Sequence, residues 1–198
     1  MNSFVMMRHG ESQWNQENRF TGFTDVDLND KGVAEAKSAG AAVKGIKFDK
    51  VYTSTLKRAY HTAEIVMKVA GQNPPVVKHD DLRERDYGDL TGLNKDETRE
   101  KFGAEQVQIW RRSYDINPPG GESLKDVVAR VKPYYEQHIL PDLKAGKDIL
   151  LAAHGNTLRA MLIVLGENTP EDINKAEIAT GVPLVFVYEG GKLHRKAA

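Results

Sequence analysis

Short apolar runs recur along this chain and are separated by segments of mixed polarity. Strands buried inside a parallel sheet have near-continuous hydrophobic sequences, because both of their faces are covered. The runs therefore predict four strands, at residues 4–7, 50–53, 148–153 and 184–188. The last of these lies near the carboxyl end of the chain, and we expect it to be the final strand.

Between the first strands, apolar residues recur at the three- and four-residue spacing of an amphipathic helix. This spacing predicts helices at residues 31–44 and 55–70. Asn29 or Asp30 can cap the first helix, because short polar side chains accept hydrogen bonds from free N–H groups at a helix start. Gly71 is placed to end the second helix.

The second half of the chain begins with a polar, charged segment that predicts only short helices, between residues 94 and 112. Ser123 then starts a long helix, with Asp126 three residues later in the position of a capping box. Pro133 lies inside this helix and is expected to kink it, because proline has no N–H to donate. A further helix is predicted at residues 157–165.

The alternation of apolar strands with helices predicts an α/β fold. We expect a three-layer α/β/α sandwich, in which a mostly parallel central sheet has helices on both faces. The 198 residues contain no linker or low-complexity tract, so one domain is expected over residues 1–198. Residues 118–121, Pro-Pro-Gly-Gly, are interpreted as a surface turn and not as a domain boundary.

Composition narrows the possible partners. Basic and acidic residues balance at 28 each, so the chain lacks the excess of positive charge that is typical of nucleic-acid and membrane-surface binders. The absence of cysteine excludes disulfides, thiolate catalysis and cysteine-based zinc sites. No apolar run approaches the ~20 residues of a membrane-spanning helix, and the amino-terminal segment is too short for a signal peptide. We therefore expect a cytoplasmic protein with no membrane or nucleic-acid partner.

Two predicted strands are followed by the same dipeptide. Residues 8–10, Arg-His-Gly, follow the first strand, and His154 and Gly155 follow the third. Arg58 lies one turn into the helix after the second strand. Because the carboxyl ends of parallel strands meet at one edge of a sheet, we expect two histidines and two arginines to converge there.

This set of side chains suits a phosphoryl group. Guanidinium groups bind phosphate oxygens bidentately, and nearby positive charge keeps an imidazole neutral by lowering its pKa. One histidine can then attack phosphorus, and the other can stabilise the transferring group. A two-histidine metal site is the competing interpretation. It lacks an obvious third ligand at short spacing and has several cations beside it, so we favour the phosphate site.

The sequence also resembles a known family. Arg-His-Gly by itself marks only the histidine phosphatase superfamily, whereas "ERDYG" at residues 84–88 and "WRR" at residues 110–112 resemble the cofactor-dependent phosphoglycerate mutases within it. The similar stretches follow the family's order and cover nearly the whole chain; they are residues 8–15, 20–22, 53–62, 82–95, 109–115 and 152–160.

The resemblance implies a role for each matching residue. His9 would be the nucleophile that becomes a phosphohistidine, and Glu84 would be the general acid and base. Arg8, Arg58 and His154 would surround the transferring phosphoryl group. The other substrate-binding residues that the resemblance implies are Gly10, Glu11, Ser12, Asn15, Thr21, Gly22, Arg85, Tyr87, Lys95, Arg111, Arg112, Gly155 and Asn156.

The implied activity is the interconversion of 3-phosphoglycerate and 2-phosphoglycerate, an isomerase reaction of glycolysis and gluconeogenesis. 2,3-Bisphosphoglycerate would be the intermediate and would also prime the enzyme, and no metal would be needed. The alternative is a phosphatase on the same scaffold, in which water discharges the phosphohistidine and the substrate is a small phosphate ester or bisphosphoglycerate. A non-catalytic phosphate-binding module is a third possibility, which the presence of both His9 and Glu84 disfavours.

The chain departs from the family pattern at three places. It lacks an extra stretch before Gly121, which leaves a homodimer or another homo-oligomer open. It ends soon after the predicted last strand, which leaves open the balance between mutase and phosphatase activity. Arg83 and Asp86, on either side of Glu84 and Arg85, differ from the residue types that the family usually has at these two positions. Glu84 itself is retained.

Overall fold

A six-stranded sheet forms the centre of the computed structural model, which describes residues 1–196. The strands lie in the order β3-β2-β4-β1-β5-β6. Neighbours from β3 to β1 are parallel, whereas β5 runs antiparallel to β1, and β6 antiparallel to β5. The prediction of a mostly parallel sheet is thus confirmed. The strands are β1 (Asn2–Arg8), β2 (Lys50–Thr53), β3 (Val76–Lys78), β4 (Ile149–Ala153), β5 (Leu184–Glu189) and β6 (Lys192–Arg195).

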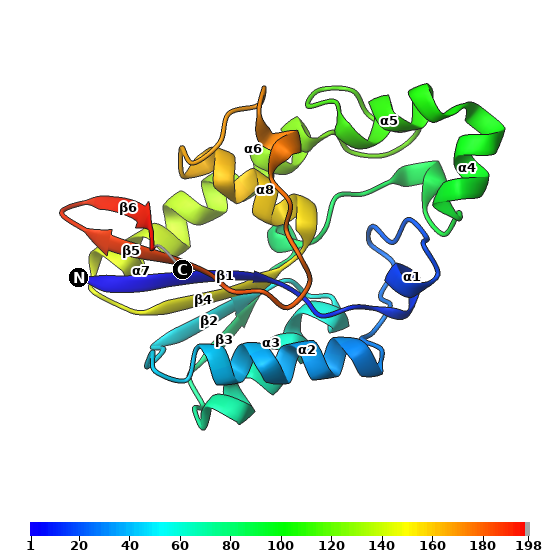
Figure 1. Cartoon of the computed structure of the whole chain (residues 1–198). Helices are drawn as coiled ribbons and strands as arrows, with labels where there is room; N and C mark the ends of the chain where they lie inside the picture. The colour runs from blue at the N-terminus through cyan, green and yellow to red at the C-terminus, as the bar shows by residue number, and fades with distance from the viewer. Residues whose placement is uncertain (197–198) are drawn as a thin grey trace.

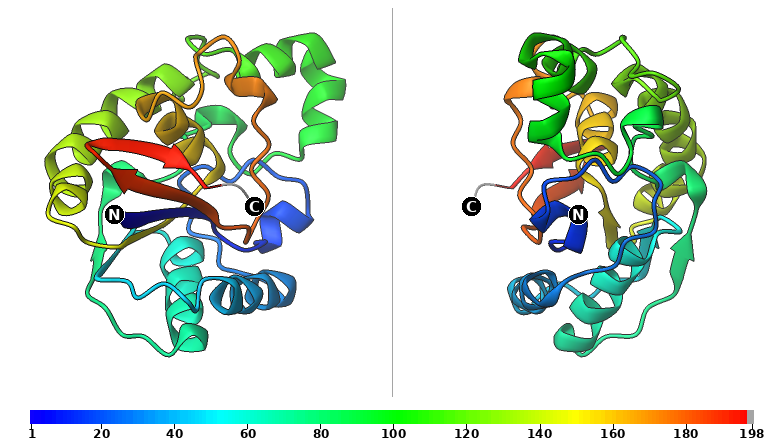
Figure 2. Two further views of the ribbon diagram at one scale, coloured as in Figure 1. Left: turned by 60° about the vertical axis from the view of Figure 1, so that its left-hand side comes forward. Right: turned by 90° about the vertical axis from the view of Figure 1, so that its right-hand side faces the viewer.

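Helices cover both faces of this sheet, which confirms the three-layer α/β/α architecture (Figure 1). One face carries α2 (Asp30–Ala42) and α3 (Lys57–Ala70). The opposite face carries α6 (Leu124–Tyr134), α7 (Leu140–Lys144) and α8 (Gly155–Val164). Beyond the carboxyl ends of the parallel strands lie α1 (Gln13–Gln16), α4 (Lys95–Phe102) and α5 (Ala104–Arg112), as Figures 1 and 2 show.

Each face of the sheet packs against its own hydrophobic core. Phe4 and Met6 of β1 join the core under α6 and α8, while Val5 and Met7 join the core under α2 and α3. All four side chains are fully buried. Successive side chains of a strand point to opposite faces, so a strand that is covered twice needs apolar residues at every position. This is why β1 is a continuous apolar run.

The predicted helix boundaries are confirmed where a capping residue sets them. The side chain of Asn29 accepts a hydrogen bond from the Gly32 N–H at 2.8 Å and starts α2. Gly71 ends α3 in the left-handed conformation, at φ 71°. Ser123 and Asp126 form the predicted capping box of α6.

Three sequence predictions were wrong in detail. The strand at 184–188 is not the last one, because the exposed, polar β6 follows it across a Gly-Gly turn. The short β3 was missed, since its residues lie at the sheet edge and form no apolar run. The helix predicted at 157–165 begins at Gly155, directly after β4. At Pro133, the predicted disturbance takes the form of a π-helical turn at Tyr135–Ile139, which joins α6 to α7.

Candidate active site

The strand order brings the two His-Gly dipeptides together. Arg8 at the end of β1 pairs with Ala153 at the end of β4, so His9 and His154 leave adjacent strands at the same level. Their ring centroids are 5.1 Å apart, with the rings edge to face. Both side chains are buried, with 2% and 0% of their surface exposed. The expected convergence of histidines at this edge of the sheet is therefore present.

His9 is held as a neutral imidazole with one free ring nitrogen. Its Nδ1 lies 2.6 Å from the carbonyl oxygen of Gly10. A carbonyl only accepts hydrogen bonds, so Nδ1 carries the proton and Nε2 retains its lone pair. Burial, followed by the positive charges of Arg58 and Arg8, lowers the pKa of His9 well below its ordinary value of 6.5. Nε2 can therefore act as a nucleophile at neutral pH.

His154 is oriented by Ser54, the residue that follows β2. The Oγ of Ser54 lies 2.7 Å from Nε2 of His154 and also accepts a hydrogen bond from the Leu56 N–H at 3.2 Å. Nδ1 of His154 is buried and has no hydrogen-bond partner within residues 1–196. Burial and the charge of Arg58 lower the pKa of His154 well below 6.5. An unpartnered polar atom in this position indicates that a polar ligand belongs beside it.

We expect these two histidines to make the protein less stable in mild acid. In the unfolded chain both imidazoles take up protons below pH 6.5, whereas in the folded protein their lowered pKa values keep them neutral. Stability is therefore lost as the pH falls below 6.5, by roughly 2–3 kcal/mol between pH 7.5 and pH 5.5 for two such groups. Urea unfolding at both pH values measures this loss. His9→Asn should reduce the difference, whereas replacing the exposed His194 by Asn should not; an equal difference in both variants would contradict the prediction.

The turn after β1 packs directly against the start of α2, backbone to backbone. A Cβ on Gly10 would lie 2.2 Å from the Gly32 carbonyl oxygen, and a Cβ on Gly32 would lie 2.0 Å from the Glu11 carbonyl oxygen. No side chain fits at either position. This contact fixes the height of His9 above the sheet edge.

We therefore expect Gly32→Ala to lower the free energy of unfolding by about 1–3 kcal/mol, the usual cost of overpacking. The turn that carries His9 must also shift, so kcat should fall more than the loss of folded protein explains. Denaturant unfolding and steady-state kinetics measure the two effects. Gly45→Ala is the matched control, because a Cβ there meets no atom within 4 Å. Equal behaviour of the two variants would show that the contact is not critical.

Arg58 and Glu84 lie beside the histidines and are both held by backbone groups. The guanidinium of Arg58 donates hydrogen bonds of 2.7 Å to the carbonyls of Gly22 and Thr24. Burial lowers the pKa of Arg58 to about 10, which leaves it charged at neutral pH. Oε1 of Glu84 accepts hydrogen bonds from the N–H groups of Arg85, at 2.8 Å, and Asn156, at 3.1 Å. Within residues 1–196 no hydrogen bond reaches Oε2 of Glu84, so this oxygen is left to act on a ligand.

A cavity of about 130 Å³ opens beside these residues. Six of its side chains are cationic, and only Glu84 is acidic. This excess of positive charge in the lining favours the binding of a small polyanion. The lining residues are Arg8, Asn15, Arg19, Phe20, Thr21, Gly22, Glu84, Tyr87, Lys95, Arg111, Arg112, Gly155, Asn156 and Arg159.

The cations of the cavity have unused hydrogen-bonding capacity. The Nε atoms of Arg8, Arg111 and Arg159 are buried and have no partner within the described residues. Burial, with the charges of Arg111 and Arg8, lowers the pKa of Lys95 to about 8. Packing so many like charges together is unfavourable without an anion between them, so the site is electrostatically prepared for its ligand.

Several predicted site residues do not line the cavity. Gly10, Glu11 and Ser12 belong to the supporting turn; the Glu11 carboxylate contacts Asn29 and Lys31 instead. His9, His154 and Arg58 are buried next to the cavity and are absent from its lining.

The guanidinium of Arg85 is also buried. It donates to the carbonyls of Glu122 at 2.6 Å, Arg111 at 3.1 Å and Trp110. Arg85 therefore fixes the end of α5, and through it the two arginines that line the cavity.

Sequence reasoning missed three lining residues: Arg19, Phe20 and Arg159. A signal for Arg159 was present, because it lies four residues after Gly155 on a helix and so on the same side of that helix. Arg19 and Phe20 precede the predicted Thr21, but no charge or hydrophobic pattern separates them from an ordinary loop.

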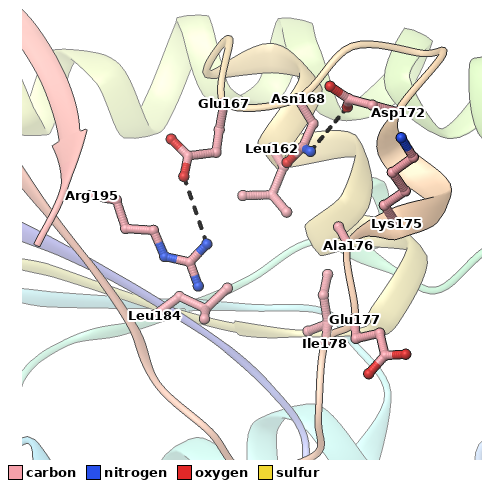
Figure 3. Close-up of a pocket in the computed structure, with 10 residues that line it drawn as sticks. All are labelled: Leu162, Glu167, Asn168, Asp172, Lys175, Ala176, Glu177, Ile178, Leu184 and Arg195. Atoms are coloured by element: carbon pink, nitrogen blue, oxygen red, sulfur yellow. Dashed lines mark hydrogen bonds and ion pairs between the residues drawn. The ribbon is translucent and has the colours of Figure 1, made fainter. Parts of the chain in front are cut away.

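A larger cavity, of about 470 Å³, lies away from this chemistry (Figure 3). Two of its charged groups pair with each other, since Arg195 lies 3.6 Å from Glu167, and the carboxylate of Asp172 accepts a hydrogen bond of 3.0 Å from Asn168. It contains no histidine. Within residues 1–196, no group of three or more His, Cys, Asp or Glu side chains is placed to hold a metal ion. The smaller, cationic cavity is therefore the candidate active site.

Comparison with known proteins agrees with this geometry. The model of the histidine phosphatase superfamily (branch 1) matches residues 4–197. The chain belongs to this superfamily. Among curated members, it is 56% identical to a 2,3-bisphosphoglycerate-dependent phosphoglycerate mutase of Bradyrhizobium diazoefficiens, over 92% of this chain and 89% of that protein. A mutase of the same name from Azorhizobium caulinodans is 54% identical, over 92% and 90%.

Solved structures share the fold of this chain. Bacillus stearothermophilus YhfR superposes with a TM-score of 0.86 at 26% identity, covering 98% of this chain and 95% of that one. A mycobacterial glucosyl-3-phosphoglycerate phosphatase superposes with a TM-score of 0.84 at 25% identity, covering 99% and 98%. The fold of this chain, a mixed sheet with helices on both faces, is thus similar to the folds of both solved structures.

Proposed function

We infer that this chain is a 2,3-bisphosphoglycerate-dependent phosphoglycerate mutase, an enzyme of glycolysis and gluconeogenesis that interconverts 3-phosphoglycerate and 2-phosphoglycerate. Identity of 54–56% to enzymes of that name, over most of the chain, is the observation that carries the inference. The site agrees with it in chemistry. Phosphoryl transfer on a small polyanion requires a nucleophile, a proton acceptor and positive charge. The site provides them as two neutral histidines, the hydrogen-bonded carboxylate of Glu84 and a cluster of cations.

In the mechanism that we propose, His9 carries the phosphoryl group on Nε2. His9 gives this group to the free hydroxyl of a bound monophosphoglycerate, while Glu84 accepts the hydroxyl proton. His9 then takes the phosphoryl group from the oxygen on the other carbon, the P–O bond breaks, and Glu84 returns the proton to that oxygen. His154, through its free Nδ1, and Arg8 stabilise the charge on the transferring oxygens.

The far end of the substrate is assigned to the cations that α4 and α5 present. Lys95, Arg111 and Arg112 line the cavity and can bind a carboxylate or phosphate bidentately or as point charges. Asn156 donates to the Tyr87 hydroxyl at 3.0 Å, which fixes both side chains against the cavity wall.

The cavity residues fit 2,3-bisphosphoglycerate as the priming cofactor. Three buried guanidinium Nε atoms that have no partner within residues 1–196, and a single acidic lining residue, suit a ligand with two phosphates and a carboxylate. Arg8, Lys95, Arg111 and Arg112 would hold it. When bound, this cofactor supplies the phosphoryl group that loads His9. We further propose that no metal takes part.

The interconversion of 3-phosphoglycerate and 2-phosphoglycerate, with and without a trace of 2,3-bisphosphoglycerate, tests this function. Phosphate release should be measured in the same reactions, because the fold resembles that of a glucosyl-3-phosphoglycerate phosphatase. We expect primed isomerisation to be faster than phosphate release and unchanged by a chelator. If phosphate release is faster, the phosphatase alternative replaces the mutase. If the chelator abolishes activity, the metal-free mechanism is wrong.

Other properties of the chain remain proposals. We propose a single domain over residues 1–198, since one sheet contains strands from both ends of the chain. The proposed substrate is a phosphorylated small molecule, and a homodimer or another homo-oligomer stays possible. No helix in residues 1–196 is long and apolar enough to cross a bilayer. A cytoplasmic location without nucleic-acid partners stays a prediction.

A further inference from the structure

Arg159 lies on α8 and meets Arg8 at the wall of the candidate active site. Nη1 of Arg159 and Nε of Arg8 lie 3.3 and 3.6 Å from the point that a Cβ on Gly155 would occupy. Gly155 thus leaves the space in which the two guanidinium groups approach each other. Both groups line the same cavity.

Other buried and partly buried arginines of this fold show how the protein normally satisfies such a group. Arg58 and Arg85 donate to backbone carbonyls, and Arg130 donates both to carbonyls and to the carboxylate of Glu122. In Arg159, by contrast, the buried Nε has no partner within residues 1–196. A buried donor without a partner is costly, so the unpartnered Nε of this partly buried arginine points to a ligand.

The charges around Arg159 are mostly positive. Burial, with the charge of Arg112, lowers the pKa of Arg159, and the charge of Glu84 raises it. Glu84 is the only acidic residue that lines this cavity, and the mechanism assigns it to proton transfer. No other carboxylate of the cavity is free to neutralise Arg159, so an anionic ligand has to do so.

The cations already assigned serve both ends of a monophosphoglycerate. Arg8 faces the group transferred by His9, and Lys95 and Arg111 face the other end of the substrate. The attraction of one further cation grows in proportion to the charge on the ligand. Arg159 therefore adds more to the binding of a ligand with two phosphates than to that of a ligand with one.

We propose that Arg159 binds a phosphate of the bisphosphorylated intermediate and keeps this intermediate in the cavity while it reorients between the two transfers. This proposal rests on the mutase function inferred above and deepens it. Arg159 is a specificity-determining residue for the bisphosphate, and it makes the bisphosphate leave more slowly than either monophosphate product.

The test uses Arg159→Met, which keeps an unbranched side chain and removes the charge. We expect the concentration of 2,3-bisphosphoglycerate that half-activates the enzyme to rise about tenfold or more, as for the loss of a charge-assisted hydrogen bond. The KM for 3-phosphoglycerate should rise about threefold or less. Labelled bisphosphoglycerate should be released in a larger fraction of turnovers, and Arg159→Lys should restore part of the difference.

Arg195→Met is the matched control, because Arg195 belongs to the other cavity and contacts Glu167. It should leave all three measurements unchanged. Calorimetric binding of 2,3-bisphosphoglycerate and of 3-phosphoglycerate repeats the comparison without turnover, so its result does not depend on whether the wild type is a mutase. Equal weakening of both ligands in Arg159→Met, or no weakening of either, would overturn the proposal. If Arg159→Met fails to fold, Arg159→Gln removes the charge in the same way, and Arg159→Lys remains the partial rescue.

Discussion

His9→Ala is expected to abolish the phosphoenzyme and to lower kcat roughly 10⁴-fold or more, because no other group can take over the nucleophile's role. The neighbouring ring of His154, with its centroid 5.1 Å away, has Nε2 bonded to Ser54 and is held in a different orientation. Incubation with labelled 2,3-bisphosphoglycerate measures the effect. The wild type should take up one phosphate that is labile in acid and stable in alkali.

Two further variants separate the roles of the histidines. His154→Ala should still take up the label, but more slowly, because it retains the nucleophile and loses a group that stabilises the transferring phosphoryl oxygens. His61→Ala should behave as the wild type. The ring of His61 is hydrogen-bonded to Asp27, and neither residue follows one of the two strands that end at His9 and His154. Label on His9→Ala at the wild-type level would show that the nucleophile has been assigned wrongly.

Glu84→Gln is expected to slow phosphoryl transfer to the substrate hydroxyl by roughly 10²–10⁴-fold, the usual contribution of general acid–base catalysis. A glutamine keeps an oxygen for the N–H groups of Arg85 and Asn156, so the geometry of the site should be retained. Substrate binding should therefore change little. Rapid-quench measurement of transfer from the phosphoenzyme to 3-phosphoglycerate, together with the substrate's dissociation constant, distinguishes the two effects.

Replacing the exposed Glu105 by Gln is the control for a general change of charge. It should alter neither quantity. If Glu84→Gln weakens binding and leaves the transfer rate intact, Glu84 is a binding residue and a different group must move the proton.

The layered fold was predictable because its central strands are continuous apolar runs in the sequence. Phe4 to Met7 face two cores, so the run is apolar throughout and cannot be mistaken for a surface segment. The caps of α2 and α6 were equally readable, since Asn29 and Ser123 act on backbone groups a few residues away. The edge strands β3 and β6 carry no such signal, because pairing on one side of an exposed strand demands little of its side chains.

The candidate site divides in the same way. His9 and His154 were recognisable as a pair, because each follows a buried strand and parallel strands deliver their ends to one edge. The positions of Arg85 and Arg159 relative to the cavity did not follow from their sequence neighbourhoods. Arg85 stands within a site motif, yet its guanidinium holds the end of α5, whereas Arg159 was passed over and lines the cavity.

The sequence by itself thus determined the strands, the main helix caps and the chemistry at two strand ends, since these depend on side-chain pattern and on near neighbours in the chain. Only the tertiary structure decided which arginines satisfy the backbone and which are left for a ligand. That choice depends on carbonyls that come from distant segments, such as those of Gly22 and Thr24 for Arg58, and of Trp110 and Glu122 for Arg85. Every arginine side chain has the same five N–H donors. The fold alone determines which acceptors these donors reach.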